Sequence, residues 1–560
     1  MTALLAHPAL VLILGAVAIA VLRGHARSGL VVTLPLLALY LLWSLPDGTH
    51  AHIRFLELDL QPLAIDKLSR LFGTVFAIML LAGGLFGLNQ QSRVELPAAF
   101  VYGGAAIGVT LAGDLVTLFV CWELMAIGST VVIWSGAAGA YRASMRYLSI
   151  HLLGGVLLMA GIAGHVAAGG SVAFDRLSLD SAAHWLILAG FLVNVGAPPL
   201  SAWLPDAYPE ASWSGMVFLS AFTTKTAVYV LLRGFPGVEL LVYIGLFMIF
   251  YGIVYALLEN DMRRILAYSI VNQVGFMVVG IGLGTQMALN GAAAHAFTHI
   301  IYKALLLMSA GSVLLMTGRR KCTDLGGLFR SMPVTAVCGI VGALAISSFP
   351  LTSGFVSKSM ISQAAADEHL LYVWLALAAA SAGVFLHAGI KFPWFVFFQK
   401  DSGLRPPDPP WNMRLAMIFF AVLCIGLGVA PGPLYALLPY PIDYVPYTAA
   451  HVVTQLQLLL FSGLAFFVML GLLRRTLTIT LDVDWLYRVP LPAIARALSR
   501  SWATAARSVG AAVVPRLRDT GARFYREHGL EGLAARTSPT GSMALWLMIM
   551  LLAYLLLYYL

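Results

Sequence analysis

Long apolar segments recur along this chain from its first residues to its last. About sixteen runs of roughly 18–25 residues are each long enough to cross a hydrocarbon core about 30 Å thick. Hydrophobic residues make up 60% of the 560 residues and charged residues only 11%, which is not the balance of a soluble domain. Because hydrocarbon offers no partner to backbone polar groups, such segments must form helices. The sequence therefore predicts an all-α polytopic membrane protein. Its first run lacks a basic leader and a cleavage site, so we expect it to be a retained helix.

Basic residues fall on alternate loops between these runs. They are Arg23 and Arg27, Arg93, Arg142 and Arg146, Arg263 and Arg264, Arg319 to Lys321, and Lys400 and Arg405. Such loops normally face the cytoplasm. We therefore expect an inner (cytoplasmic) cell membrane location with both termini on the periplasmic or external side. A nucleic-acid partner is not expected, because most of these residues are flanked by membrane spans.

Two of the predicted helices are interrupted by proline. In 183–204, the seventh helix, Pro198 and Pro199 remove backbone donors; in 334–365, the twelfth, the break lies at 347–354. Non-helical backbone at membrane depth survives where it is buried in protein or lines a wet cavity, although a simple kink is the alternative. Breaks at matching positions of two antiparallel halves indicate a transport site between repeats. We predict about 14 core transmembrane helices with two inverted five-helix repeats and C-terminal extra helices.

The predicted organisation has six parts. They are N-terminal transmembrane helices in 1–94, a first repeat of helices 4–8 in 95–232, a second repeat of helices 9–13 in 239–400, helices 14–15 in 412–473, a basic amphipathic segment in 476–542 that we expect in the cytoplasm, and a C-terminal transmembrane helix in 543–560.

One apolar helix carries three titratable residues at helical spacing. His295, His299 and Lys303 follow i, i+4, i+8, so they share one face over about 12 Å. Histidine titrates near neutral pH and can pass a proton between its ring nitrogens, and the pattern predicts a proton relay. The alternatives are histidines that only pack, or a zinc site. Zinc is disfavoured because the third residue is a lysine and no carboxylate is nearby in the sequence.

Further charged residues lie within apolar runs. A charge at the bilayer centre costs roughly 2.5–3.5 kcal/mol on insertion scales, so such residues usually mark ion routes. Here they are Glu123, Lys225, Lys358 and, nearer a helix end, Lys391. We expect a lysine to be the partner of Glu123, with a purely structural ion pair as the alternative. No nucleotide, metal or other cofactor motif occurs, so no cofactor is expected and any redox catalysis belongs to other subunits.

Several motifs resemble a known family. They are W-E-L-M around Glu123, W-L-P-D-A-Y-P-E-A at 203–211, T-T-K-T-A-V-Y at 223–229, N-D-M-R-R-I-L-A-Y-S at 260–269, H-A-F-T-H-I-I-Y-K-A-L-L at 295–306 and S-G-F-V-S-K at 353–358. Over roughly residues 60–400 the chain is similar to the antiporter-like membrane subunits of respiratory complex I and to the large subunits of Mrp-type multisubunit cation/proton antiporters.

The resemblance implies a lateral chain of protonatable groups. In this sequence the matching residues are Glu123, Lys225, His295, His299, Lys303 and Lys358. The family usually has a lysine just before the break in the seventh helix, and this lysine is the partner of the glutamate in the fifth helix, here 114–134. This chain has Asn194 at the position of that lysine. Two hypotheses follow: Glu123 titrates by itself, or Lys225 becomes its cationic partner.

The segment 476–542 combines many arginines with apolar residues. It holds Arg488, Arg496, Arg500, Arg507, Arg516, Arg518, Arg523, Arg526 and Arg536, interleaved with Trp485, Leu498, Trp502, Val513 and Phe524. We expect it to bind anionic lipid at the inner leaflet, with a solvated linker as the alternative. Pro490, Pro492 and Pro515 lead us to expect two or more short helices rather than one long helix.

The resemblance implies an ion-translocating function. We expect a proton-translocating subunit of a multisubunit complex, most similar to the D-type subunits of Mrp Na⁺/H⁺ antiporters, with other membrane subunits as partners. Within the family, the alternatives are a proton-pumping component of a complex I-like or hydrogenase-type redox complex, or the membrane component of an inorganic-carbon uptake complex. A different class, a stand-alone transporter of an organic solute, is disfavoured. It would need a cavity with substrate-binding groups, whereas the polar groups here form a line of titratable side chains. A third class is a scaffold that only anchors other subunits. If the chain were such a scaffold, neutralising Lys225 or His299 would leave ion transport intact.

Overall fold

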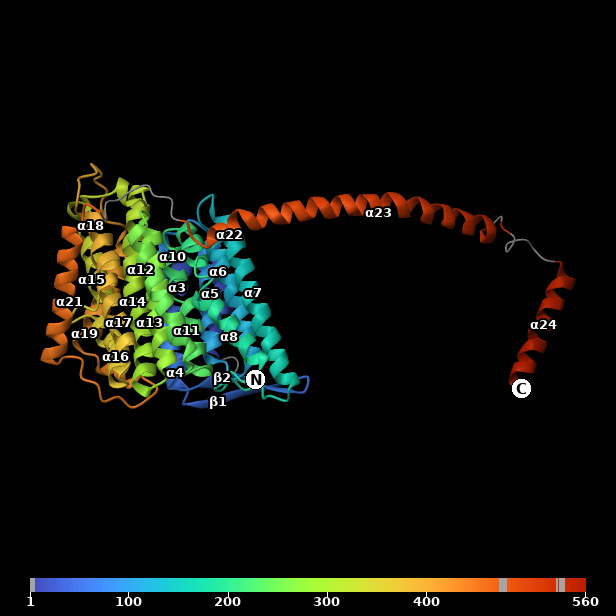
Figure 1. The fold of residues 1–560 in the computed structure, drawn as a ribbon, viewed down its shortest axis with the longest axis horizontal. Helices are drawn as coiled ribbons and strands as arrows, with labels where there is room; N and C mark the ends of the chain where they lie inside the picture. Colours follow the sequence, from blue (N-terminus) through green and yellow to red (C-terminus); the bar gives the residue numbers. More distant parts are fainter. Residues whose placement is uncertain (1–5, 473–480, 530–531, 533–538, 560) are drawn as a thin grey trace. The chain divides into compact units, whose positions relative to one another are not determined.

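The computed structural model describes residues 6–472, 481–529, 532 and 539–559, and the chain divides into two units, Met1–Asp484 and Trp485–Leu560. In the first unit, long helices stand side by side, with a β-hairpin at one end of the bundle (Figure 1).

The first half of that unit begins with two helices and the hairpin. Its elements are α2 (Pro8–Val21), α3 (Gly24–Ser44), β1 (Gly48–Phe55), β2 (Leu58–Ile65), α4 (Lys67–Phe86), η1 (Gly87–Asn89), α5 (Glu95–Leu111), α6 (Leu115–Trp134), α7 (Ala140–Ala167), α8 (Ala182–Val195), α9 (Trp203–Ala207), η2 (Tyr208–Glu210), α10 (Gly215–Leu219) and α11 (Thr223–Gly234).

The second half continues with the longest buried helices. Its elements are α12 (Leu240–Leu258), α13 (Met262–Leu283), α14 (Gln286–Thr317), η3 (Cys322–Asp324), η4 (Leu328–Arg330), α15 (Pro333–Ile346), α16 (Ser353–Asp367), α17 (Leu371–Val384), the π-helical η5 (Phe385–Lys391), α18 (Phe392–Phe397), α19 (Trp411–Val429), α20 (Gly432–Ala436) and α21 (Ala449–Val468).

The helices agree with the predicted membrane class. Within the described residues, twelve helical spans are long and apolar enough to cross a membrane, and α2, α5, α8 and α15 are shorter apolar helices. Two of these shorter helices, α8 and α15, are the first parts of the helices that were expected to break. The prediction of an all-α polytopic membrane protein is confirmed, and the inverted relation of the two repeats stays a prediction.

The hairpin is a feature that the sequence patterns did not predict. Residues 1–94 were expected to hold transmembrane helices, but β1 and β2 pair antiparallel between α3 and α4, with Gly48 opposite Ile65 and Phe55 opposite Leu58. β1 is largely exposed, whereas Leu63 and Ile65 of β2 are buried. The segment joins two membrane helices at the end of the bundle and is too short and polar to cross the membrane.

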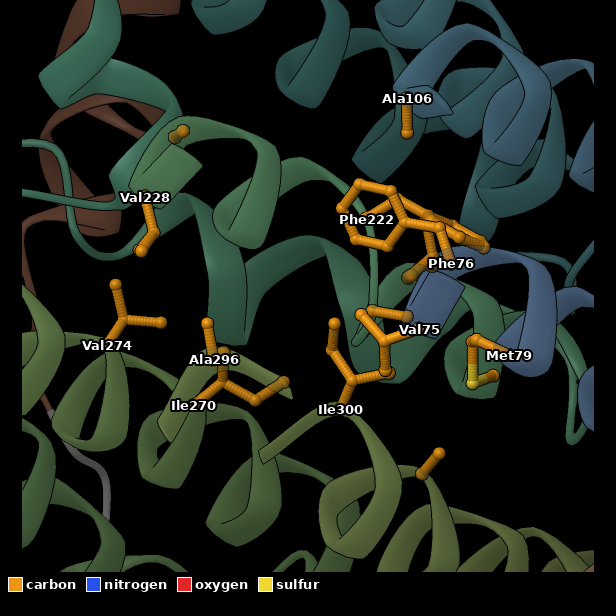
Figure 2. Packing of buried hydrophobic residues seen from close by; sticks show 14 of the residues in the cluster. Val75, Phe76, Met79, Ala106, Phe222, Val228, Ile270, Val274, Ala296 and Ile300 are labelled. Carbon is orange, nitrogen blue, oxygen red and sulfur yellow. The ribbon is translucent and has the colours of Figure 1, made fainter. Parts of the chain in front are cut away.

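The core of the first unit is built around α13 and α14. All residues of the most apolar window of α13 are buried, and α14 packs against α13, α16, α15 and α4. In Figure 2, Val75 and Phe76 of α4 lie in one cluster with Phe222 and with Ile300 of α14. The Phe76 and Phe222 rings meet edge to face at 5.3 Å. The polar residues of α13 and α14 are therefore sealed from lipid by closely packed apolar side chains.

The C-terminal unit holds one long helix, which corrects an expectation. α22 (Asp484–Arg488) ends just before α23, which runs unbroken from Pro490 to His528, and α24 covers Thr540–Tyr559. The prediction of two or more short helices was wrong. Pro490 and Pro492 lie in the first turn, where no intrahelical donor is needed. Pro515 removes one internal hydrogen bond, but no residue of α23 is buried, so water can satisfy the freed carbonyl.

Candidate functional site

Both predicted helix breaks are present. α8 ends at Val195, Gly196 follows with φ +81°, and helical structure resumes at Trp203. α15 ends at Ile346 and α16 begins at Ser353. Gly196 adopts a left-handed conformation that is costly for residues with a side chain. Each break places peptide groups without helical partners beside buried polar side chains.

A third break lies beside Lys225, and it was missed. α10 ends at Leu219 and α11 starts at Thr223, and no proline marks the interruption. The fully buried ammonium of Lys225 donates to the Ser220 carbonyl at 2.6 Å and to Thr224 Oγ1 at 3.0 Å. The break therefore supplies the carbonyl that holds this lysine. The polar run T-T-K-T inside an apolar segment was the available signal.

The three titratable residues of α14 form the predicted stripe. His295, His299 and Lys303 all have 0% exposed surface. Lys303 Nζ donates to Ser269 Oγ at 2.9 Å on α13. The His295 and His299 rings are 6.2 Å apart, and His299 lies within electrostatic range of both Lys225 and Lys303. The stripe thus lies between Lys225 of α11 and the end of the polar face of α14 at Lys303.

His295 belongs to a hydrogen-bond network that the sequence did not reveal. Its Nδ1 lies 3.2 Å from Ser357 Oγ and its Nε2 lies 3.1 Å from Gln273 Oε1. The hydroxyl of Tyr302 donates to the same Gln273 oxygen at 3.1 Å. Because that oxygen is an acceptor, His295 Nε2 carries the hydrogen in this geometry. Ser357 is the neighbour of Lys358, so the network leads from α14 to α16.

Lys358 borders a polar cavity. Its ammonium lies 3.5 Å from the Ile346 carbonyl and 5.0 Å from the centre of the Phe276 ring. The cavity has a volume of about 300 Å³ and is also lined by Ser348, Ser359, Ser381, Tyr444, His451 and Gln455. His295 lies within electrostatic range of Lys358. The polar side chains that run from His295 through Ser357 to Lys358 therefore reach an open cavity between α16, α17 and α21.

Glu123 does not have the lysine partner that we expected. In the part of the chain that the structure describes, Glu123 forms no ion pair, and its buried Oε1 has no hydrogen-bond partner. Lys225 is instead held by Ser220 and Thr224. Oε1 lies over Gly155 of α7, where an ideal Cβ atom would fall only 1.9 Å away. The expectation of a lysine partner was wrong, because α8, the predicted seventh helix, supplies no lysine and the break at 220–222 retains Lys225.

Asn194 approaches the preceding glycine of α7, Gly154. Its Oδ1 is 3.5 Å from the ideal Cβ position of Gly154. The side chain is fully buried, and neither amide atom has a hydrogen-bond partner among the described residues. Glu123 and Asn194 therefore approach α7 at neighbouring positions, where two small residues leave room for polar groups.

Several buried polar side chains in this region have atoms without a hydrogen-bond partner in the described part of the chain. Among the described residues, buried side-chain atoms without a protein partner include Trp122 Nε1, Glu123 Oε1, His151 Nε2, both amide atoms of Asn194, Ser201 Oγ, Thr226 Oγ1, both ring nitrogens of His299, Ser348 Oγ and His387 Nε2. Buried polar groups are rarely left unpaired, and ordered water commonly satisfies them. Those of Asn194, Ser201, Thr226 and Ser348 lie at or beside the helix breaks, as a hydrated path requires.

Lys391 makes a different kind of contact. Its ammonium donates to three carbonyls at the C-terminal end of α12, those of Ala256, Leu257 and Glu259, at 3.1, 2.5 and 2.7 Å. A cation there compensates the negative end of the helix dipole. Lys391 therefore caps α12, apart from the α14 stripe.

Two buried histidines were missed in the sequence. His151 on α7 is stacked on Tyr147 at 3.8 Å between ring centres and meets Trp203 edge to face. It lies one turn before Gly155, on the side of α7 that Glu123 approaches. His387 lies in η5. Each is a single histidine in an apolar run, and a lone histidine did not stand out beside the paired residues of α14.

Comparison with known proteins places this geometry in a family. Residues 112–385 match the model described as "NADH:quinone oxidoreductase/Mrp antiporter, TM". The probable A/B-type component of a K⁺/H⁺ antiporter from Rhizobium meliloti is 32% identical, over 59% of this chain and 35% of that protein. The D-type component of a Na⁺/H⁺ antiporter from Alkalihalophilus pseudofirmus is 28% identical, over 67% of this chain and 82% of that protein.

A solved structure has the same fold over nearly the whole chain. It is a chain of the membrane-bound sulfane sulfur reductase, an archaeal respiratory membrane complex, with a TM-score of 0.71 and 25% identity. The match covers 98% of this chain and 99% of that chain. Residues 112–385 therefore form a region of the NADH:quinone oxidoreductase/Mrp antiporter family, and the chain as a whole is similar to the antiporter-like membrane subunits of such complexes.

Proposed function

We propose that the chain is a proton-translocating, antiporter-like subunit of a multisubunit membrane complex, working in Mrp-type Na⁺/H⁺ antiport. The observation that carries the proposal is the buried line of Lys225, His299, His295 and Lys358, which ends at a polar cavity of about 300 Å³. Protons can move along such a line through side chains and water, since neighbouring titratable groups exchange protons and like charges discourage simultaneous occupancy.

Glu123 forms the other end of the proposed path. Its carboxyl group, the Asn194 amide and His151 all have unpartnered atoms near the Gly154–Gly155 pair. Water between these groups would join Glu123 to Lys225. Because Asn194 cannot hold a proton, the family's charge pair is absent here, and Glu123 must exchange its proton with water or with Lys225.

The orientation and the lipid partner are part of the same proposal. Arg320 pairs with Glu210 at 3.1 Å and with Asp261 at 2.9 Å, so the basic loops at 261–264 and 319–321 meet the turn at 208–210 at one face. We assign this face to the cytoplasm because it gathers the arginines. α23, with its exposed arginines and apolar residues, would bind anionic lipid of the inner leaflet. Accessibility of single cysteines at Arg319 and Asp180 to an impermeant maleimide tests the assignment.

Transport by the intact complex tests the function. The tagged complex is purified from its native membranes, reconstituted into liposomes, and assayed for Na⁺-driven proton movement with a pH-sensitive dye. Lys225→Met and Lys303→Met should each abolish the signal with normal assembly, whereas Lys67→Met, which changes an exposed lysine, should not. Unchanged transport in both buried variants would show that this chain is a scaffold.

A redox-driven pump is the second candidate, favoured by the nearly complete match to a chain of a respiratory complex. The proteins that copurify distinguish the two. Small hydrophobic antiporter subunits support Mrp-type exchange, and iron–sulfur or nickel proteins support a redox complex.

A further inference from the structure

His387 is a fully buried histidine in the π-helical segment η5, between α17 and α18. Its Nδ1 lies 2.8 Å from the Gly383 carbonyl. A carbonyl oxygen only accepts, so Nδ1 carries the hydrogen. Its Nε2 is buried and has no partner among the described residues. The free lone pair of the imidazole is therefore available to take up a proton.

Three lysines lie near this histidine, and one of them, Lys391, is four residues later in the same π-helical segment. His387 lies within electrostatic range of Lys303, Lys358 and Lys391. Lys303 is the last residue of the α14 stripe, Lys358 borders the polar cavity, and Lys391 reaches the carbonyls at the end of α12. His387 is thus a titratable group that lies near the stripe, the polar cavity and the ammonium that caps α12.

The backbone around His387 also differs from an ordinary helix. A π-helical turn widens the helix by one residue and is frequently found at functional sites. Two residues later, Gly389 packs against the break between α15 and α16, where an ideal Cβ would fall 2.4 Å from Ser347 Oγ. The wide turn therefore fits directly against the interruption that leads into Lys358.

We propose that His387 is a proton-relay residue that connects Lys303 with Lys358. This inference rests on the proposed proton translocation. The Lys303 ammonium releases a proton, through water, to His387 Nε2, which gives an imidazolium and a neutral amine. The imidazolium then passes the proton from Nε2 to a neutral Lys358, and Nδ1–H stays on the Gly383 carbonyl. One proton enters and one leaves. Because the imidazolium lies among lysines, it is tolerated only when one of them is neutral.

A purely structural role for His387 makes a different prediction. In His387→Asn, the amide nitrogen can take the place of Nδ1 and keep the bond to Gly383, but the side chain cannot hold a proton. His387→Ala loses both properties. A structural role predicts that Asn restores what Ala loses, and a relay predicts that both variants fail equally. His7 provides a matched control, since it is buried with both ring nitrogens partnered, and His7→Asn should transport normally.

The test measures proton transport by the reconstituted complex carrying each variant. We expect His387→Asn and His387→Ala to lower the rate by about tenfold or more, with unchanged amounts of assembled complex. Recovery in His387→Asn to at least half the wild-type rate overturns the relay. If Lys303→Met stops transport and His387→Asn does not, the relay is wrong and the proposed function stands. If the wild-type complex moves no protons, both are wrong.

Discussion

The carboxyl oxygen Oε1 of Glu123 lies directly over Gly155, so that an ideal Cβ atom on this glycine would fall 1.9 Å from it. No other residue type leaves room for the carboxyl group at this position. Glu123 therefore depends on a neighbouring helix for its place in the bundle, although it has no ion-pair partner among the described residues.

Substitution of this glycine should disturb transport without unfolding the protein. Gly155→Ala places a methyl group where the carboxyl group lies, and we expect a several-fold slower proton transport with normal assembly. The measurement is dye-monitored transport by the reconstituted complex. Gly426→Ala on α19, where an added Cβ meets nothing within 4 Å, is the control. Equal rates in the two variants would contradict a functional position for Glu123.

Restoring the family lysine should change transport. Asn194→Lys introduces an ammonium beside the Gly154–Gly155 pair, close enough to hold Glu123 in its ionised form. We expect the pH dependence of transport to shift, because a fixed ion pair replaces a carboxyl group that exchanges protons freely. Asn194→Gln is the uncharged control. Transport of Asn194→Lys that matches the wild type at every pH would contradict both hypotheses for Glu123.

Asp66 should make stability depend on pH. It caps α4, accepts from Ser69 N at 2.8 Å and pairs with Arg233 at 2.5 Å. Burial raises the pKa of the Asp66 carboxyl, but Arg233 and Ser69 outweigh it and hold that pKa below its ordinary value. The stabilisation is therefore present above the unfolded pKa of about 3.9 and is lost as the pH falls through the folded pKa.

The corresponding measurement is thermal unfolding in detergent between pH 7 and pH 3. Asp66→Asn should lower Tm at pH 7, and its difference from the wild type should shrink below about pH 4. Asp443→Asn, at an exposed loop position, should leave Tm unchanged. A Tm difference that stays constant over the whole range would exclude the ion pair as its cause.

Asp482 should stabilise the bundle through two tyrosines. Its Oδ2 accepts from Tyr251 at 2.6 Å and from Tyr268 at 2.7 Å. Hydrogen bonds to charged groups contribute roughly 1.5–3 kcal/mol each, so Asp482→Ala should lower Tm clearly. Tyr268→Phe should destabilise the wild type and have little further effect in Asp482→Ala. Additive losses would mean that the two residues act independently.

Much of the site could be predicted from local patterns. Helical spacing placed His295, His299 and Lys303 on one face, and the double proline placed the helix 7 break at the end of α8. The break before Lys225 was missed because it has no proline, and its local signal was the polar run T-T-K-T alone. It is stabilised by contacts with α5, such as the bond between Tyr102 and Thr223. His387 was missed for a similar reason, since a π-helical turn depends on packing against another helix.

The sequence by itself determined the membrane class, the two proline breaks and the residues that could carry protons, because hydrophobicity, helical period and proline chemistry are properties of neighbouring residues. Only the tertiary structure decided that Glu123 lies over Gly155 with no lysine partner among the described residues, that Lys391 caps α12, and that Lys358 borders a cavity. The partner of a buried side chain is chosen by how helices distant in sequence pack. The same reasoning applies to α23. Its prolines suggested separate short helices, but its exposed surface lets water satisfy the freed carbonyl, so that one long helix forms.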